Sequence, residues 1–448
     1  MQNGNKMGTQ PILRLIVSMS LPPVISMFMQ YSYNFVDSAF VAQLSEAALT
    51  AVSLSFPVTS MMCAASIGLG VGINVHIARS LGRREQDRAD ESVTMGILLA
   101  FLCGIVLNAV ALAVTPAYFA AFTGDPEIYA LCREYMSVCV FMQIPNMVHI
   151  AIQKIIQATG NMLAPMGFQI AGVVFNLIFD PVLIFGLGPF PAMGVRGAAL
   201  STVLGYTFSM LLAFWVLLGT KQKVRMKLRG FRVRPVTVKE IFTLGLPSFL
   251  MNALYSLTVT FANIFLVGSM TAIAFFGAYY KAQHMIIMTV NGLIQGCLPI
   301  MSYNYGARDF TRLRTTFRYG LLLAAAMMGL GALGLFAFPV PILRLFKASP
   351  EMLELGVPAI RILVLGYAFN GASTLIATYL QAWGRIRTSI GINLSRQLLI
   401  LVPMMALLSR FWGMRGIWAA FPMTETLTLL LALLLLRRLQ RQAETEAR

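Results

Sequence analysis

The chain is a succession of long apolar segments, each about as long as a helix that crosses a membrane. Such a helix needs about 20 predominantly apolar residues, and the sequence divides into twelve of these segments, joined by short connections. Hydrophobic residues make up 58% of the 448 residues and charged residues only 11%, which excludes a water-soluble globular protein. The expected spanning helices cover residues 15–40, 48–76, 93–116, 128–153, 163–187, 196–219, 241–267, 272–300, 316–340, 352–381, 389–410 and 416–436.

Lys and Arg gather in alternate connections between these helices. They give the chain its formal net charge of +17, yet the connections at 41–47, 118–127 and 267–272 contain none of them. Because cytoplasmic loops of membrane proteins carry the excess of basic residues, the alternation predicts that both termini are cytoplasmic. It also accounts for the charge without a nucleic acid, which would need basic and aromatic side chains on one folded face. The basic clusters are Arg79, Arg83, Arg84 and Arg88; Lys221, Lys223, Arg225, Lys227, Arg229, Arg232, Arg234 and Lys239; and Arg308, Arg312, Arg314 and Arg318.

The two halves of the chain repeat each other at an offset of about 224 residues. Leu21-Pro22 recurs as Leu246-Pro247, and residues 157–160 (QATG) recur as 381–384 (QAWG). Each half holds six expected spans, so both halves enter the membrane from the same side and the repeat is parallel. We therefore expect a six-helix lobe at 1–219, a basic cytoplasmic linker at 220–239, a second six-helix lobe at 240–436 and a cytoplasmic tail at 437–448.

Two carboxylates lie inside expected spans of the first half. A charged group at the middle of a span costs about 2.5–3.5 kcal/mol even on the lower insertion scales, so it is a functional candidate by default. From the helical rise, Asp37 lies roughly 33 Å along the first helix and Asp180 roughly 25 Å along the fifth. Asn176 precedes Asp180 by one turn on the same face, and Thr202 lies at a similar depth on the sixth helix. Together these groups suit a proton or a hard monovalent cation, whereas each carboxylate alone is also compatible with an interfacial or purely structural role.

The first helix also carries a polar stripe that leads to Asp37 in one-turn steps. Ser26, Gln30 and Asn34 form this stripe. It is compatible with a position facing the lobe interior or a substrate cleft, and equally with hydrogen bonds between helices.

The second half does not repeat the acidic pair. At the repeat offset Asp180 corresponds to Val402, although Pro403 reproduces the proline that follows Asp180. Instead this half holds Lys281 and Glu425 at matching depths, either as a structural ion pair or as a pair that responds to substrate. We expect His284 to form a hydrogen bond between helices and Arg396 to extend to the cytoplasmic interface.

These patterns resemble the multidrug and toxic compound extrusion (MATE) family along essentially the whole chain. The resemblance is carried by residues 34–37 (NFVD), 176–181 (NLIFDP), 194–197 (GVRG), 280–283 (YKAQ) and 395–397 (SRQ). It implies a two-lobed exporter of cationic, amphipathic drugs driven by H⁺ or Na⁺. It also implies a cation-coupling site of Asp37, Asn176, Asp180 and Thr202 in the first lobe. The acidic residues that some members use in helices 7 and 10 are not matched here.

We therefore predict a secondary active antiporter that exports organic cations against H⁺ or Na⁺ from a bacterial inner membrane, as a monomer and without a cofactor. The substrate cleft is expected to include Gln30, Asn34, Lys281, Gln283 and Glu425. The alternative within transport is a flippase or exporter of a lipid-linked or amphipathic anion, whose cleft would need several Arg or Lys residues. A membrane enzyme is disfavoured because the three His residues show no motif, and no phosphate-binding loop for ATP is present.

Overall fold

The computed structural model describes residues 5–266, 268–346 and 348–446, which are almost entirely helical and contain no strand. They separate into two compact units. One unit consists mainly of residues 25–249, and the other mainly of residues 7–24, 250–305 and 309–446. Outside the described part lie residues 1–4 of the predicted first lobe, 267 and 347 of the predicted second lobe, and 447–448 of the predicted tail.

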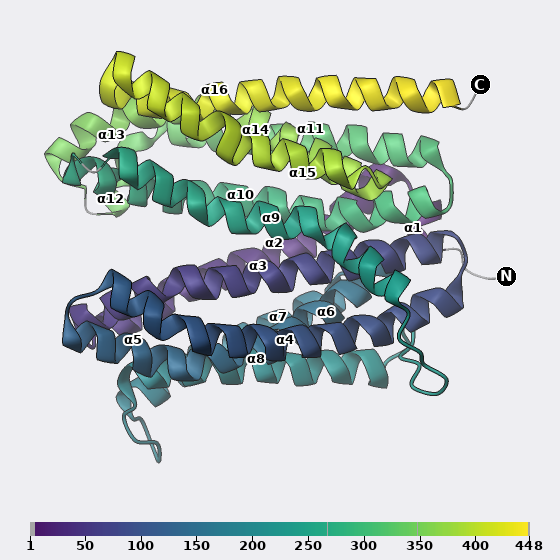
Figure 1. Ribbon diagram of the computed structural model, residues 1–448, viewed down its shortest axis with the longest axis horizontal. Coiled ribbons are helices and arrows are strands. Elements are labelled where there is room, and N and C mark those ends of the chain that lie inside the picture. Colours follow the sequence, from purple (N-terminus) through teal and green to yellow (C-terminus); the bar gives the residue numbers. More distant parts are fainter. Residues whose placement is uncertain (1–4, 267, 347, 447–448) are drawn as a thin grey trace. The chain divides into compact units, whose positions relative to one another are not determined.

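The first half of the chain runs from α1 to α8 (Figure 1). The helices are α1 (Lys6–Thr9), α2 (Ile12–Ala42), α3 (Glu46–Gly82), α4 (Gln86–Phe122), α5 (Pro126–Cys139), the 3₁₀ turn η1 (Val140–Met142), α6 (Gln143–Ala158), α7 (Leu163–Phe185) and α8 (Gly194–Gly219). The predicted fourth span is therefore one rod made of α5, η1 and α6. Tight connections join the helices, as at Ser45, whose hydroxyl accepts from the N–H of Ala48 at 3.0 Å and caps α3.

The second half repeats this plan from α9 to α16. Its elements are α9 (Pro235–Leu266), α10 (Met270–Gly306), α11 (Phe310–Ala337), α12 (Pro339–Leu345), α13 (Pro350–Leu363), η2 (Val364–Gly366), α14 (Tyr367–Trp383), α15 (Ile386–Leu394), the π-helix η3 (Ser395–Ile400) and α16 (Leu401–Glu446). The short 3₁₀ turn η2 divides the tenth predicted span just as η1 divides the fourth. The repeat found in the sequence is thus also a repeat of local backbone irregularities.

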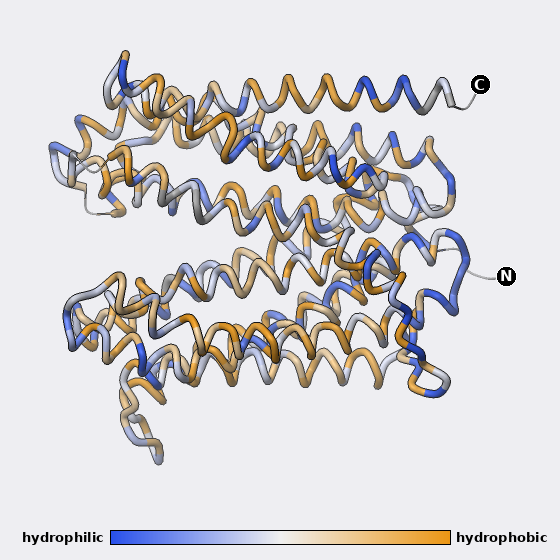
Figure 2. The backbone as a smooth tube through the Cα atoms, viewed as in Figure 1, coloured by the Kyte–Doolittle hydropathy of each residue, from blue (hydrophilic) through white to orange (hydrophobic). Residues whose placement is uncertain are grey.

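Ten helical segments of the described chain are long and apolar enough to cross a membrane. One of them, Ile386–Gln442, contains two predicted spans, and Gly413 breaks its helical geometry with a φ of 55°. Only a residue without a side chain adopts that conformation readily, so Gly413 marks the turn between the last two spans. The remaining predicted span, 241–267, is α9 within the described residues. Figure 2 shows the apolar residues along the helices and hydrophilic residues at many of their ends.

The boundary between the two units falls inside α2 and inside α9. Residues 12–24 of α2 group with the second unit and residues 25–42 with the first, while α9 changes unit after Phe249. Both boundaries lie two residues or fewer from a proline, Pro23 in α2 and Pro247 in α9. A proline inside a helix removes one backbone hydrogen bond and favours a bend. The repeated Leu-Pro pair therefore marks where each helix passes from one unit to the other.

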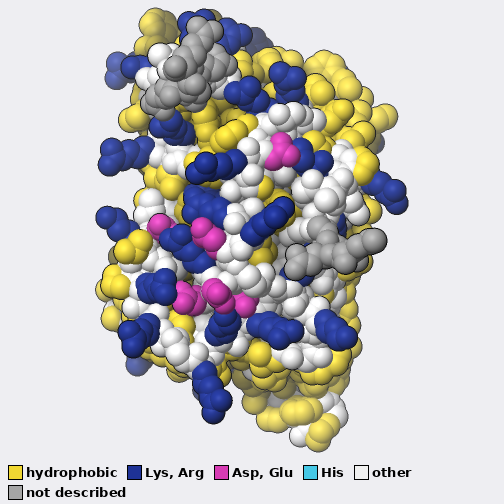
Figure 3. All heavy atoms as spheres, turned by 90° about the vertical axis from the view of Figure 1, so that its right-hand side faces the viewer, with side chains coloured by type: hydrophobic (Ala, Val, Ile, Leu, Met, Phe, Trp, Pro, Cys, Tyr) yellow, Lys and Arg dark blue, Asp and Glu magenta, His cyan; other side chains and the backbone are white. Residues whose placement is uncertain are grey.

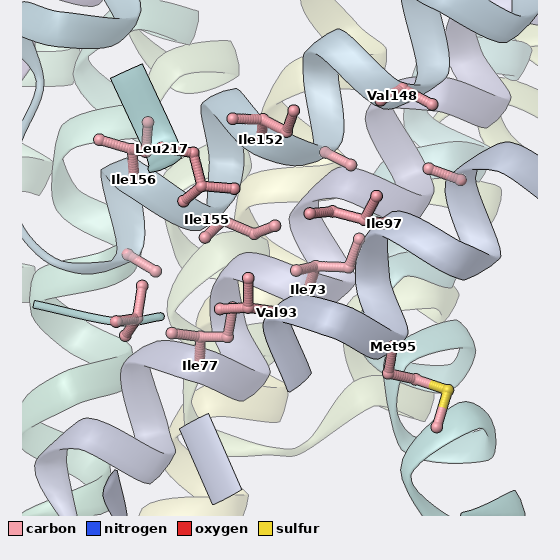
Figure 4. Close-up of a cluster of buried hydrophobic side chains, with 14 of the residues drawn as sticks. Ile73, Ile77, Val93, Met95, Ile97, Val148, Ile152, Ile155, Ile156 and Leu217 are labelled. Carbon is pink, nitrogen blue, oxygen red and sulfur yellow. The ribbon is translucent and has the colours of Figure 1, made fainter. Parts of the chain in front are cut away.

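The core of the first unit lies among α3, α4, α6 and α8. Figure 4 shows apolar side chains from these helices directed toward one another. The buried members include Ile73 and Ile77 of α3, Val93 and Ile97 of α4, Ile152, Ile155 and Ile156 of α6, and Leu217 of α8. In a bilayer the packing of such surfaces, rather than release of water, holds helices together. This packing fixes the scaffold on which the polar residues of α2, α7 and α8 are placed.

The basic segment between α8 and α9 is bound to the start of α4. Asp90, which is 5% exposed, accepts from the N–H of Arg225 at 2.9 Å, and Thr94 exchanges hydrogen bonds of 3.0 Å with the backbone of Lys227. The Lys227 ammonium donates to Asp87, and this contact raises the pKa of Lys227. Lys and Arg are numerous on the face shown in Figure 3. The predicted linker is therefore an ordered strap on the first unit.

Candidate functional site

The centre of the candidate site is a pair of carboxylates from two helices of the first unit. Asp37 of α2 and Asp180 of α7 interact electrostatically with each other, and Asp180 is 0% exposed. Within the described chain, neither oxygen of Asp180 nor Oδ1 of Asp37 has a partner in hydrogen-bonding geometry. Buried polar atoms are nearly always satisfied in folded proteins. Asp180 is fully buried and Asp37 partly buried, and their three unsatisfied oxygens are ones that a proton or a cation could satisfy.

Neutral oxygen-bearing groups surround this pair. The Ser201 hydroxyl of α8 lies close to Asp180 and donates to Oδ1 of Asn176 at 3.2 Å. The hydroxyls of Tyr33 and Thr202 lie 3.4 Å apart, and Tyr33 interacts electrostatically with both carboxylates. The structure thus brings all four predicted coupling residues into one region.

Close packing between α7 and α8 positions these groups. A Cβ placed on Gly205 would lie 3.0 Å from Cβ of Asn176, and one on Gly172 would lie 2.8 Å from Cβ of Ser209. Small residues of this kind allow helix backbones to approach closely in membranes. The α7 helix continues through Pro181, whose missing N–H leaves the carbonyl of the preceding turn without its usual donor. The glycines hold the two helices together at the level where Asn176 and Ser201 meet.

A chain of three amide side chains joins α6, α7 and α2. Gln153 of α6 donates to Gln169 of α7 at 2.8 Å, and Gln169 donates to Gln30 of α2 at 2.9 Å. Gln30 also interacts with the hydroxyl of Tyr206. The polar stripe of the first helix is therefore divided, because Gln30 enters this network while Asn34 is exposed.

In the second unit, Glu425 forms its ion pair with Arg396. The Nε atom of Arg396 lies 3.3 Å from Oε1 of Glu425, and the two side chains keep only 11% and 17% of their area exposed. Asn370 donates to the same oxygen at 2.9 Å, and Nη1 of Arg396 donates to Thr374 at 3.0 Å. The expectation that Arg396 extends to the cytoplasmic interface is wrong, because this residue is held inside the unit by a carboxylate and a hydroxyl.

Arg396 lies on the π-helix η3. Pro403 follows in the first turn of α16. A π-helix is rare and commonly occurs at functional sites, and a helix that loses a hydrogen bond to a proline can adjust locally in this way. Gln397, also on η3, is hydrogen-bonded to Thr258 of α9. The π-helix thus carries two polar side chains, Arg396 and Gln397, that contact neighbouring helices.

The other predicted residues of the second unit are less enclosed. Lys281 is exposed and Gln283 is partly buried. The ring of His284 lies 3.3 Å, through Nδ1, from the Tyr255 hydroxyl on α9, which is the contact between helices expected for it. No three His, Cys, Asp or Glu side chains in the described ranges lie together as a bound metal ion would require.

Two segments of the chain match the same family profile, MatE, at residues 22–182 and 247–407. They begin and end at equivalent points of the two halves, and together they cover well over half of the chain. The chain belongs to the MatE family. It is therefore a multi-pass membrane transporter of a multidrug-efflux family and not an enzyme, which confirms the family resemblance and the twelve-helix, two-lobe fold expected from the sequence.

Individual MatE relatives match along nearly their whole length. The chain is 27% identical over 433 residues to the "FAD transporter" of Shewanella oneidensis, covering 95% of each chain. It is 24% identical to the multidrug export protein MepA of Staphylococcus aureus, over 95% of this chain and 93% of the relative. Among solved structures, a multidrug resistance MATE family transporter in an outward-facing conformation superimposes with a TM-score of 0.92 at 24% identity, covering 100% and 99% of the two chains.

Sequence reasoning missed several residues around the carboxylates and the Arg396–Glu425 pair. Ser201 adjoins the predicted Thr202, and Tyr135 of α5 interacts electrostatically with Asp37. A signal was available for Ser201, because it lies three or four residues from other small residues of α8 that face α7. Tyr135 gave none, since one aromatic residue within an apolar span is ordinary.

Proposed function

We propose that this MatE transporter exports organic cations from a bacterial inner membrane, as a monomer, and that inward movement of H⁺ or Na⁺ through the Asp37–Asp180 site drives the export. The observation that supports this most is the buried, unsatisfied pair of carboxylates. Neither group has a basic partner in an ion pair among the described residues, unlike Glu425. Their negative charge is therefore left to be balanced by an ion from outside the protein.

The coupling requires that the cation and the substrate favour different conformations. A ligand shifts a conformational equilibrium only by its difference in affinity for the two states. Binding of a cation between α2 and α7 would draw Asp37 and Asp180 together, and its release toward the cytoplasm would let them separate. The membrane potential contributes about 2.3 kcal/mol for each charge moved across 100 mV, enough to bias such an equilibrium strongly.

The test is efflux from proteoliposomes under an imposed Na⁺ gradient and, separately, an imposed pH gradient, with ethidium as the probe substrate. Asp37→Asn and Asp180→Asn should each abolish gradient-driven efflux while the protein stays folded. Glu354→Gln, at an exposed carboxylate of α13, is the control and should transport normally. Full gradient-driven efflux by both Asp variants would disprove the proposal.

A second candidate is export of an amphipathic anion. The sequence argued against it because Lys281 was the one basic residue expected at mid-depth, but the structure adds Arg396, enclosed within the second unit. The relative from Shewanella oneidensis is named a transporter of FAD, a compound that carries phosphates. The same liposomes, tested with an anionic and a cationic substrate of similar ring structure, distinguish the two candidates.

A further inference from the structure

We propose that the terminal nitrogens of Arg396 bind a phosphate group of an aromatic substrate within the second unit, and that Glu425 acts as an internal counter-ion that weakens this binding. The inference rests on the second candidate function, export of an amphipathic anion, in that the bound anion would be the exported compound. It assigns a role to a pair of residues that cation coupling at Asp37 and Asp180 does not use.

The guanidinium of Arg396 has unused hydrogen-bond donors. Its Nε faces Glu425 and one N–H of Nη1 is taken by Thr374, which leaves the rest of Nη1 and the whole of Nη2 without a partner among the described residues. Two parallel N–H groups on adjacent nitrogens match two oxygens of a phosphate, and this bidentate geometry is the reason Arg is favoured at such sites. The free edge of Arg396 therefore has the chemistry of an anion site.

The remaining oxygen of the carboxylate is enclosed, which disfavours a cation at this pair. Among the described residues, Oε2 of Glu425 is buried and has no hydrogen-bond partner. Behind it α16 packs tightly on the η2 turn, since a Cβ on Gly366 would lie 3.1 Å from Cβ of Glu425. No Arg396 nitrogen is among the buried atoms without a partner in the described chain. An anion at this pair would therefore be held by the terminal guanidinium nitrogens.

A group of aromatic side chains in the same unit is connected to Glu425 through Tyr279. Tyr279, whose hydroxyl accepts from Tyr367 at 2.9 Å, interacts electrostatically with both Glu425 and Tyr255. Tyr255 in turn lies beside Tyr280 and His284, with tilted rings whose centroids are 5.2 and 5.6 Å away. These three rings are only partly buried. They offer a flat apolar surface of the kind that accepts an aromatic ring by offset stacking.

The experiment compares three probes that share one ring: 1-naphthyl phosphate, 1-naphthol and 1-naphthylmethylammonium. Binding to the purified full-length protein in detergent is measured by fluorescence, without any ion gradient. The wild-type protein should bind the phosphate at least about tenfold more tightly than the other two, as expected of one charge-assisted pair. Tighter binding of the ammonium probe would overturn the proposal.

Variants separate a binding role from a structural ion pair. Arg396→Gln should lose the preference for phosphate, and Glu425→Gln should strengthen phosphate binding by about tenfold because a competing negative charge is removed. Since Arg396→Gln leaves a buried carboxylate without its partner, the double variant Arg396→Gln/Glu425→Gln serves as a folded form that should also lack the preference. Arg387→Gln, at an exposed arginine of the neighbouring α15, is the matched control and should bind as wild type.

The outcome is independent of cation coupling. Asp37→Asn and Asp180→Asn should bind 1-naphthyl phosphate normally even though they fail to transport, so a loss of binding in these variants would count against a site confined to the second unit. If the folded double variant keeps the preference for phosphate, Arg396 does not hold the anion and the proposal is wrong.

Discussion

The two units treat buried charge in opposite ways. In the first, Asp37 and Asp180 lie together, and no Lys, Arg or His among the described residues forms an ion pair with either. In the second, Glu425 is matched by Arg396 and by a donor from Asn370. An unpaired buried charge is costly, whereas a paired one is tolerated. The comparison supports the proposal that the first unit takes its counter-ion from outside, whereas the carboxylate of the second unit has one within the protein.

The backbone of the two units differs far less than their charge. Pro181 and Pro403 occupy equivalent places in the repeat, and the 3₁₀ turns η1 and η2 interrupt equivalent spans. In the first unit the helix runs through Pro181, whereas in the second a π-helix forms ahead of Pro403. The two halves thus share the positions of their backbone breaks, while the local geometry and the buried charge at those positions differ.

Among single substitutions, we expect the largest effect on transport at Asp180. Asp180→Asn keeps the shape and removes the negative charge, so we expect cation-driven efflux to fall by at least about 100-fold, equivalent to roughly 2.8 kcal/mol. Initial rates in proteoliposomes measure this. A decrease of less than twofold would mean that the first unit does not need the charge.

Breaking the pair in the second unit should affect stability more than coupling. Arg396→Gln leaves Glu425 buried without its counter-ion, which costs about 3–5 kcal/mol in buried pairs. We expect a clearly lower thermal unfolding temperature in detergent, restored in large part by adding Glu425→Gln. If the single and double variants were equally unstable, the ion pair would not be the cause.

Removing one neutral ligand should sharpen the assignment of the first unit. Ser201→Ala deletes the hydroxyl next to Asp180 and its bond to Asn176, a loss of about 1 kcal/mol and therefore about fivefold in cation affinity. The cation concentration that gives half-maximal efflux should rise, with the maximal rate little changed. An unchanged cation dependence would remove Ser201 from the site.

The smallest effect is expected at Lys281. This residue is exposed, and Glu425 already has Arg396 as its ion-pair partner. Exposed charges usually contribute less than about 1 kcal/mol, so Lys281→Gln should change both stability and efflux by less than about fivefold. A loss comparable to that of Arg396→Gln would restore Lys281 as the essential cation of the second unit.

The sequence predicted the positions of the spans and several polar residues of the first unit, but not Ser201 or Tyr135. Counting helical rise placed Asp37, Asn176, Asp180 and Thr202 at similar depths, and the structure brings them together. The depth of a residue in the membrane can be estimated from its position along a helix. That estimate does not require knowing which helices are neighbours.

The pair in the second unit could not be found in this way. Whether two side chains meet depends on the rotation of their helices, which depth along the chain does not give. The π-helix at Ser395–Ile400 departs from the 3.6-residue period of a regular α-helix. The sequence therefore suggested Lys281 as the partner of Glu425. It left open whether that pair would serve structure or substrate binding.

The most direct test of the contrast between the units is equilibrium binding of the coupling cation to the purified protein. Binding of ²²Na⁺ and uptake of protons would be measured separately in the wild-type protein, in Asp37→Asn and Asp180→Asn, and in Glu425→Gln. Our account predicts that one of these cations binds to the wild type, that either Asp variant loses this binding, and that Glu425→Gln keeps it. Binding that survives in both Asp variants and disappears in Glu425→Gln would contradict the account.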